Sequence, residues 1–229
     1  MRVFLNTIII LLMLIFQSDK YSVARKRMVN QQIVNRGISN TATINSMNKV
    51  PRHKFVPENQ VPYAYEDRPL GIGYGQTISQ PYIVAYMTEM LKVGSNDKVL
   101  EIGTGFGYQA AVLAEIVDQV YTVEIVEPLG IAAEKRMKEL GYSNVKTKIA
   151  DGYYGWEEYA PYDGIIVTAA AEFIPPPLIK QLKEGGRMII PIGSPYYTQH
   201  LVLAEKKQGK TKTRNLLPVR FVPFTRSGE

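Results

Sequence analysis

The chain has 229 residues, of which 45% are hydrophobic and 21% charged, the composition of one globular domain. It has no cysteine and only two histidines, which excludes thiol nucleophiles, disulfides and cysteine-based metal sites. A net charge of +6 and a pI of about 9.3 would suit a nucleic-acid or membrane partner, but the basic residues are scattered, so we interpret the chain as a mildly basic enzyme.

Residues 1–22 form an apolar leader, with an unbroken hydrophobic run from Ile8 to Phe16. The run is long enough for a signal peptide but short for a membrane span, which needs about 20 apolar residues. More positive residues follow the run than precede it, which favours a catalytic domain on the cytoplasmic side. We therefore expect a cytoplasmic domain that residues 3–16 could tether to the membrane, and export through a signal peptide is the alternative.

Residues 23–229 are predicted to be a single domain, with an N-terminal helical and lid extension over residues 25–80. The pattern predicts an amphipathic helix over Arg25–Arg36 and a second short helix after Asn40. Prolines and glycines then punctuate Val56–Gln80, which predicts an irregular loop. Long loops of this kind are commonly lids over functional sites.

A polar string, Gly75-Gln76-Thr77-Ile78-Ser79-Gln80-Pro81, ends this loop. Pro81 suits the first turn of a helix that runs to Leu91, and helix N-termini favour anions. The side chains of Gln76, Thr77 and Ser79 could therefore donate hydrogen bonds to a carboxylate or to cofactor hydroxyls. Alternatively, the two hydroxyls merely satisfy the start of the helix.

Beyond Leu91, short apolar runs alternate with helical patterns, which predicts an α/β fold with a doubly wound, Rossmann-like sheet. The sheet should be mostly parallel and end in an antiparallel C-terminal hairpin. The expected strands are Val99–Ile102, Val120–Val123, Val145–Ala150, Tyr162–Val167, Arg187–Ile192, His200–Glu205 and Leu217–Val222, and the expected helices are Tyr108–Val117, Pro128–Leu140 and Pro175–Lys183. In such a sheet, cofactors bind at the C-terminal ends of the strands.

The first strand runs into a glycine turn, Glu101-Ile102-Gly103-Thr104-Gly105-Phe106-Gly107. Glycines allow backbone N–H groups to approach a ligand closely. A carboxylate inside the apolar run is poorly explained by core packing, so we expect Glu101 to face the ligand. The dinucleotide fingerprint would require a glycine where Tyr108 stands. The form E-x-G-x-G-x-G instead resembles motif I of the S-adenosylmethionine methyltransferases.

Two further acidic residues follow the next strands. Glu124 lies about twenty residues after the first glycine, where a carboxylate can hold a ribose diol through two hydrogen bonds. Asp151, with Gly152, suits the adenine amino group and close packing over the base, although it could be an ordinary turn aspartate. These features fit any adenosine cofactor and do not separate NAD from S-adenosylmethionine.

If the cofactor is S-adenosylmethionine, the residues that the chain lacks exclude several classes of methyl acceptor. Thr168-Ala169-Ala170-Ala171, after the fourth strand, has neither the amide nor the prolines typical of enzymes that methylate amino groups of nucleic acids. Methylation at cytosine C5 would require a cysteine. A carboxylate is already nucleophilic at neutral pH and needs only hydrogen-bond donors to orient it. Ser79 and its neighbours could supply them.

Together these stretches resemble the protein-L-isoaspartate O-methyltransferase family, from about Arg25 to Thr225. The strings that carry the resemblance are Val50–Pro57, Gly75–Pro81, Glu101–Gly105, Tyr162–Ala170 and Arg220–Pro223, among which Gln-Thr-Ile-Ser-Gln-Pro is the most specific. The resemblance implies methyl transfer from S-adenosyl-L-methionine to the free α-carboxylate of L-isoaspartyl residues, which starts repair through a succinimide.

The resemblance also implies roles for individual residues. Ser79 takes the position of the active-site serine, and Gln76, Thr77 and Ile78 line the substrate pocket. The residues expected to hold the cofactor are Glu101, Gly103, Gly105, Glu124, Asp151, Gly152 and Thr225. We expect no metal and no nucleic-acid partner, and a monomer that acts on damaged peptides and proteins.

Three other interpretations compete with this one. The chain could be an S-adenosylmethionine enzyme with a different acceptor, for which the basic pI is the only support. An NAD-dependent oxidoreductase is disfavoured by Tyr108 in place of the third glycine. A non-catalytic binding module with the same fold is disfavoured by Ser79 and the intact glycine turn.

Overall fold

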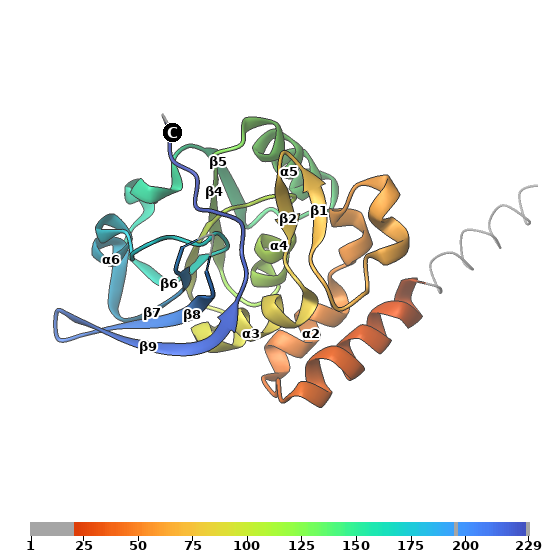
Figure 1. Cartoon of the computed structure of the whole chain (residues 1–229), viewed down its shortest axis with the longest axis horizontal. Helices are drawn as coiled ribbons and strands as arrows, with labels where there is room; N and C mark the ends of the chain where they lie inside the picture. The colour runs from red at the N-terminus through yellow and green to blue at the C-terminus, as the bar shows by residue number, and fades with distance from the viewer. Residues whose placement is uncertain (1–20, 195–196, 228–229) are drawn as a thin grey trace, which may run out of the picture.

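A computed structural model of the chain describes residues 21–194 and 197–227, which are built around a seven-stranded sheet (Figure 1). Its strands are β3 (Lys98–Ile102), β4 (Gln119–Glu124), β5 (Val145–Ile149), β6 (Tyr162–Val167), β7 (Leu182–Ile192), β8 (Gln199–Lys207) and β9 (Lys210–Val219). Their spatial order is β5-β4-β3-β6-β7-β8-β9. Neighbouring strands are parallel from β5 through β4, β3 and β6 to β7. Strand β8 pairs antiparallel with both of its neighbours, β7 and β9. The predicted sheet with its antiparallel hairpin is confirmed.

Helices cover both faces of the sheet. They are α3 (Pro81–Leu91), α4 (Tyr108–Ala114), α5 (Glu127–Glu139) and α6 (Pro176–Gln181). Successive side chains of a strand point to opposite faces, so Val99 and Val120 pack in the layer that contains α3 and α4, while Leu100 and Tyr121 pack in the layer that contains α6. By the same alternation Glu101 shares the face of Val99 and lies beneath α4.

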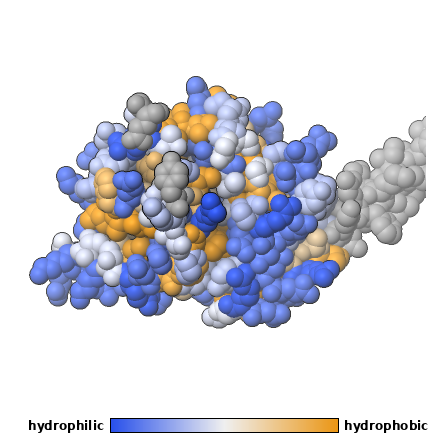
Figure 2. Space-filling model, viewed as in Figure 1, coloured by the Kyte–Doolittle hydropathy of each residue, from blue (hydrophilic) through white to orange (hydrophobic). Residues whose placement is uncertain are grey.

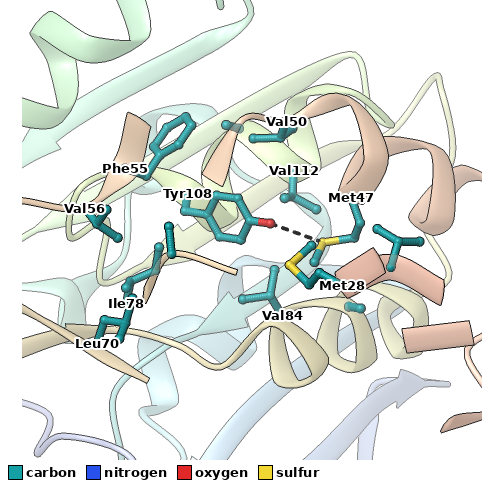
Figure 3. Packing of buried hydrophobic residues seen from close by; sticks show 14 of the residues in the cluster. Met28, Met47, Val50, Phe55, Val56, Leu70, Ile78, Val84, Tyr108 and Val112 are labelled. Carbon is teal, nitrogen blue, oxygen red and sulfur yellow. Dashed lines mark hydrogen bonds between the residues drawn. The ribbon is translucent and has the colours of Figure 1, made fainter. Parts of the chain in front are cut away.

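The N-terminal extension packs beside this core, at the end of the molecule opposite the β8–β9 hairpin (Figure 1). Residues 21–36 are helical and stop at Gly37, whose φ is 93°. Helix α2 (Thr41–Lys49) is capped by Asn40, which accepts a hydrogen bond from the Thr43 N–H at 2.9 Å. Both predicted helices are confirmed. Figure 3 shows that the Tyr108 hydroxyl of α4 points toward Met47 of α2 in the shared core.

The prediction of an irregular loop over Val56–Gln80 is wrong in its second half. There β1 (Leu70–Gly73) and β2 (Gln76–Ile78) form a hairpin, after the 3-10 turns Arg52–Phe55 and Glu58–Tyr63. Tyr74 and Gly75, with φ values of 54° and 71°, form its two-residue turn, since hairpins favour turns with positive φ. Strands of three and four residues are too short for alternation to show in the sequence.

Some predicted boundaries in the second half of the chain are also wrong. The last strand lies at Lys210–Val219 rather than at 217–222, and α4 ends at Ala114 rather than at Val117. The strand expected at Arg187–Ile192 begins earlier, at Leu182, because Gly185 and Gly186 lie inside β7 at an irregularity in its pairing with β6. Gln208 and Gly209, both with positive φ, form the turn between β8 and β9, and Figure 2 shows a hydrophilic tip there.

No helix within residues 21–194 and 197–227 is long and apolar enough to cross a membrane. The anchor expected over residues 3–16 lies outside the described residues. Two further 3-10 turns, Gly152–Tyr154 and Glu157–Tyr159, connect β5 to β6 and place Gly152 at the C-terminal edge of the sheet.

Candidate active site

The glycine turn between β3 and α4 is held from the neighbouring strand β6. The Thr168 hydroxyl donates to the carbonyl of Gly103 at 2.7 Å and to that of Ile102 at 3.1 Å. Gly103 has a φ of 94°, and a Cβ at this position would lie 2.3 Å from the Thr168 hydroxyl oxygen. Only glycine fits both the backbone conformation and the space. Gly107, with a φ of 91°, is the N-cap residue of α4.

Glu124, at the end of β4, joins the glycine turn to the start of α5. Its Oε2 accepts a hydrogen bond from the Gly105 N–H at 2.7 Å, and its Oε1 accepts one from the Val126 N–H at 2.9 Å. The residue is only 5% exposed. Each carboxylate oxygen has a second lone pair, so Glu124 can also accept hydrogen bonds from the two hydroxyls of a ribose.

A cavity opens above these groups at the C-terminal ends of β3, β4 and β6. Five of the residues expected to hold the cofactor line it: Gly103, Gly105, Glu124, Gly152 and Thr225. Its other lining residues are Gln76, Thr77, Ile102, Val123, Ile125, Val126, Thr168, Ala169, Val222, Pro223 and Phe224. The donor set fits an adenosine cofactor, because a carboxylate for the ribose lies beside apolar side chains that suit a purine base.

Residues 220–227, which we call the strap, close this cavity from the C-terminus. The Ala170 N–H donates to the Val222 carbonyl, and the Phe224 N–H donates to the Ala170 carbonyl, both at 2.9 Å. The strap therefore pairs with the loop after β6. Sequence reasoning included Thr225 but missed Val222, Pro223 and Phe224, because only the tertiary fold brings the C-terminus back over the sheet edge.

Asp151 does not line the cavity, although its neighbour Gly152 does. Its Oδ1 accepts from the Tyr153 N–H at 2.9 Å, and its Oδ2 accepts from the Nε of Arg226 at 2.9 Å and from the N–H and hydroxyl of Ser227. Burial alone would raise the pKa of Asp151, but the hydrogen bonds from Arg226, Tyr153 and Ser227 lower that pKa below its usual value. In this structure the carboxylate holds the strap.

Glu101 is not placed at the cavity, contrary to the expectation that it faces the ligand. Its side chain is fully buried beneath α4, and its Oε2 accepts from the Thr122 hydroxyl at 2.5 Å. Thr122 in turn contacts the Thr104 hydroxyl of the glycine turn at 2.6 Å. Burial raises the pKa of Glu101 to about 8; the Thr122 bond opposes the shift, and the charge of Glu124 adds to it. Glu101 therefore supports the turn from below through Thr122 and Thr104, and burial favours its protonated form.

A second hollow, the acceptor groove, lies between the start of α3 and the end of β9. Ser79 lines it and is half-buried. Its other lining residues are Pro69, Thr77, Gln80, Ile83, Pro218, Val219, Arg220 and Phe221. Thr77 lines both the groove and the cofactor cavity, so the two hollows meet at this residue.

Two residues expected in the substrate pocket lie elsewhere. Ile78 is 6% exposed and packs in the core, since the alternation of β2 turns it away from Thr77. Gln76 lines the cofactor cavity instead of the groove. Sequence reasoning did not single out Arg220, the only charged residue that lines the groove, although it lies in a string that carries the family resemblance.

The cavity holds groups for a nucleoside cofactor, and the groove meets it at Thr77, the arrangement of an S-adenosylmethionine-dependent methyltransferase. Sequence comparison identifies the family. The chain belongs to the protein-L-isoaspartate(D-aspartate) O-methyltransferase family, whose sequence profile matches residues 23–229.

Named relatives agree with this assignment. The chain is 57% identical over 217 residues to protein-L-isoaspartate O-methyltransferase 2 of Syntrophobacter fumaroxidans, covering 90% of this chain and 88% of the relative. It is 58% identical over 208 residues to protein-L-isoaspartate O-methyltransferase 1 of Nitrosospira multiformis, with the same two coverages.

Solved structures are similar in fold. One protein-L-isoaspartate O-methyltransferase superimposes with a TM-score of 0.80 at 32% identity; the match covers 87% of this chain but spans only 65% of that longer chain. A Plasmodium falciparum chain, described as a protein-L-isoaspartate O-methyltransferase in complex with S-adenosyl-L-homocysteine, superimposes with a TM-score of 0.75 at 28% identity. That match covers 88% of this chain and 98% of the other.

Proposed function

We propose that this protein transfers a methyl group from S-adenosyl-L-methionine to the free α-carboxylate of L-isoaspartyl residues in damaged peptides and proteins. Methylation converts the carboxylate into an ester with methoxide as its leaving group. The following backbone nitrogen can then attack the ester carbonyl, expel methanol and close a succinimide, which reopens in part to normal aspartate. The observation that carries the proposal is the meeting of the cofactor cavity and the Ser79 groove at Thr77.

The cofactor is proposed to be held by the glycine turn and two strand ends. Glu124 would accept hydrogen bonds from the ribose hydroxyls, Gly103 and Gly105 would allow close approach of the backbone, and Gly152 and Thr225, which also line the cavity, would enclose the rest of the cofactor. Asp151 contributes by holding the strap, and Glu101 by supporting the turn. Bound S-adenosylmethionine supplies an electrophilic methyl group, and these residues position it and exclude water.

Ser79 is proposed to orient the acceptor carboxylate by donating its hydroxyl proton in a hydrogen bond. No general base is needed, because a carboxylate with a pKa of about 4 is ionised at neutral pH. Thr77 lies where acceptor and cofactor meet, and Gln76 faces the cofactor side. The guanidinium of Arg220 makes the groove favourable for an anionic acceptor.

We further propose that residues 23–229 act as one domain and as a monomer on damaged protein chains, with residues 25–80 as the extension that covers the site. No nucleic-acid partner is needed for this chemistry. The apolar run of residues 3–16 and the basic residues after it support a cytoplasmic domain tethered to the membrane. Mass spectrometry of the mature N-terminus would distinguish this from export, which removes the leader.

The test uses labelled S-adenosylmethionine and two synthetic peptides that differ only in carrying isoaspartate or aspartate at one position. We expect methyl transfer to the isoaspartyl peptide alone. Ser79→Ala should lower the rate about 10–100-fold, since it removes a donor aimed at the acceptor, whereas Ser95→Ala, at an exposed serine outside both hollows, should not. Equal transfer to both peptides, or to neither, would contradict the proposal.

A further inference from the structure

Arg52 is a buried cation with no acidic partner among the described residues. The residue is 0% exposed and is among the largest fully buried side chains of the described residues. None of the ion pairs found in residues 21–194 and 197–227 includes it, and the groups that influence its charge most are the neutral phenols of Tyr108 and Tyr65. Burial lowers the pKa of Arg52 below its usual value. An unpaired buried cation is costly, so its contacts need an explanation.

The guanidinium reaches three separate parts of the active-site region. Its Nε donates to the Ala64 carbonyl at 2.8 Å, and its Nη2 donates to the Ser79 carbonyl, also at 2.8 Å. Its central carbon lies 4.7 Å from the ring centroid of Tyr108. Ala64 ends the 3-10 turn of the lid, Ser79 lines the acceptor groove, and Tyr108 is the first residue of α4, directly after the glycine turn.

Two of these three parts, Tyr108 and Ala64, are themselves held in the core. The Tyr108 ring packs edge-on against Phe55 with centroids 5.5 Å apart, in the buried cluster shown in Figure 3. Ala64 is fully buried. Ser79, by contrast, lies in the short link between β2 and α3, and the following residue, Gln80, caps α3 without a side-chain hydrogen bond. The Arg52 contact therefore joins the peptide of Ser79 to two buried parts of the fold.

We propose that Arg52 is a positioning residue for methyl transfer, which fixes the Ser79 peptide relative to the lid and the glycine turn and so aims the Ser79 hydroxyl into the acceptor groove. Arg52 lines neither the cavity nor the groove, so it acts through Ser79 and does not touch the substrate. The planar fork of an arginine can donate to two carbonyls in fixed directions, which an ammonium cannot reproduce. The inference rests on the proposed role of Ser79.

The test is a double-mutant cycle of Arg52→Lys and Ser79→Ala, measured with the isoaspartyl peptide. Lysine keeps the positive charge but cannot donate to the Ala64 and Ser79 carbonyls in the two fixed directions of a guanidinium. The stoichiometry of S-adenosyl-L-homocysteine binding, measured by calorimetry, counts the folded molecules, and kcat is normalised to that count; the same titration gives the affinity. Arg187→Lys is the matched control, because Arg187 also donates to a backbone carbonyl, that of Met90 at 3.1 Å, but lies away from Ser79.

We expect Arg52→Lys to lower kcat about 10–100-fold, the cost of a misplaced group, with the affinity for S-adenosyl-L-homocysteine within about threefold of the wild type and with Arg187→Lys near the wild type. In the Ser79→Ala background the same substitution should have almost no further effect, since two residues that act as a unit are not additive.

Three outcomes would overturn the inference. One is additive losses in the cycle. Another is a normalised kcat equal to that of the wild type. The third is failure of both Arg52→Lys and Arg52→Gln to bind S-adenosyl-L-homocysteine, because Arg52 would then hold the fold as a whole. A Ser79→Ala variant with full activity would instead contradict the proposed role of the serine, which distinguishes the two failures.

Discussion

Arg226 and Asp151 join the C-terminal strap to the edge of the sheet beside the cofactor cavity. The Arg226 Nε donates to the Asp151 Oδ2 at 2.9 Å, and the guanidinium lies 3.7 Å from the ring centroid of Tyr153. Asp151 is directly followed by Gly152, which lines the cavity, and Arg226 directly follows Thr225, which lines it from the other side. The ion pair therefore joins two segments that are far apart in the sequence and that line the cavity from opposite sides.

Removing the ion pair between Arg226 and Asp151 should speed the release of S-adenosyl-L-homocysteine, the product formed from the cofactor. We expect Arg226→Gln to raise the dissociation rate of S-adenosyl-L-homocysteine about twofold to fivefold, the range of a partly exposed ion pair, as measured by stopped-flow fluorescence. Arg214→Gln, at an exposed position on β9, should leave the rate unchanged. An unaltered rate in Arg226→Gln would show that the strap stays closed without the ion pair.

A methyl group on Gly103 should abolish tight cofactor binding. Its Cβ would lie 2.3 Å from the Thr168 hydroxyl oxygen, so Thr168 would have to give up its bonds to the turn. Gly141→Ala is the matched control, because Gly141 also has a positive φ, 79°, but nothing lies within 4 Å of the added Cβ. Both variants should lose about 1–2 kcal/mol of unfolding free energy from the left-handed backbone, measured in urea. Only Gly103→Ala should also lose cofactor affinity; equal affinities would contradict the steric argument.

Replacing Glu124 even with the similar side chain of glutamine should weaken cofactor binding. Both of its oxygens accept from backbone N–H groups, those of Gly105 and Val126. An amide would have to point its NH₂ group at one of these donors, which leaves a buried donor unsatisfied. We expect Glu124→Gln to weaken S-adenosylmethionine binding about tenfold or more by calorimetry, while Glu127→Gln, at an exposed position, has no effect. Wild-type affinity in Glu124→Gln would mean that the turn does not depend on the carboxylate.

Glu101 should make the stability of the protein depend on pH. Its folded pKa of about 8 lies above its usual value of 4.5, so between about pH 5 and 8 the folded chain keeps a proton that the unfolded chain releases. Unfolding free energy therefore falls as the pH rises through this window, by about 1 kcal/mol per unit. Glu101→Gln removes this loss. Urea unfolding of both proteins at pH 5.5 and 7.5 should show the variant gaining relative stability at the higher pH, and parallel pH dependences would contradict the buried neutral acid.

Local patterns in the sequence predicted the elements of the fold well. Strands β3 to β6 and helices α3 and α5 were found within one or two residues, because apolar runs, N-terminal prolines and glycine stops are local signals. The β1–β2 hairpin was missed, since its strands are short and its turn is Tyr74-Gly75 rather than Asn-Gly. The start of β9 was placed too late because its first half is polar and exposed.

For the site, the sequence by itself determined the residues with a local signature: the glycine turn, Glu124 at the end of its strand, and Ser79 before α3. Only the tertiary structure decided the partners. The alternation of β3 turns Glu101 beneath α4, the return of the C-terminus commits Asp151 to Arg226, and the packing of the lid brings Arg52 onto Ser79. These pairs join segments separated by 27 residues, for Arg52 and Ser79, and by 75, for Asp151 and Arg226. Backbone conformation is set by near neighbours, whereas a contact between distant segments exists only once the whole core has packed.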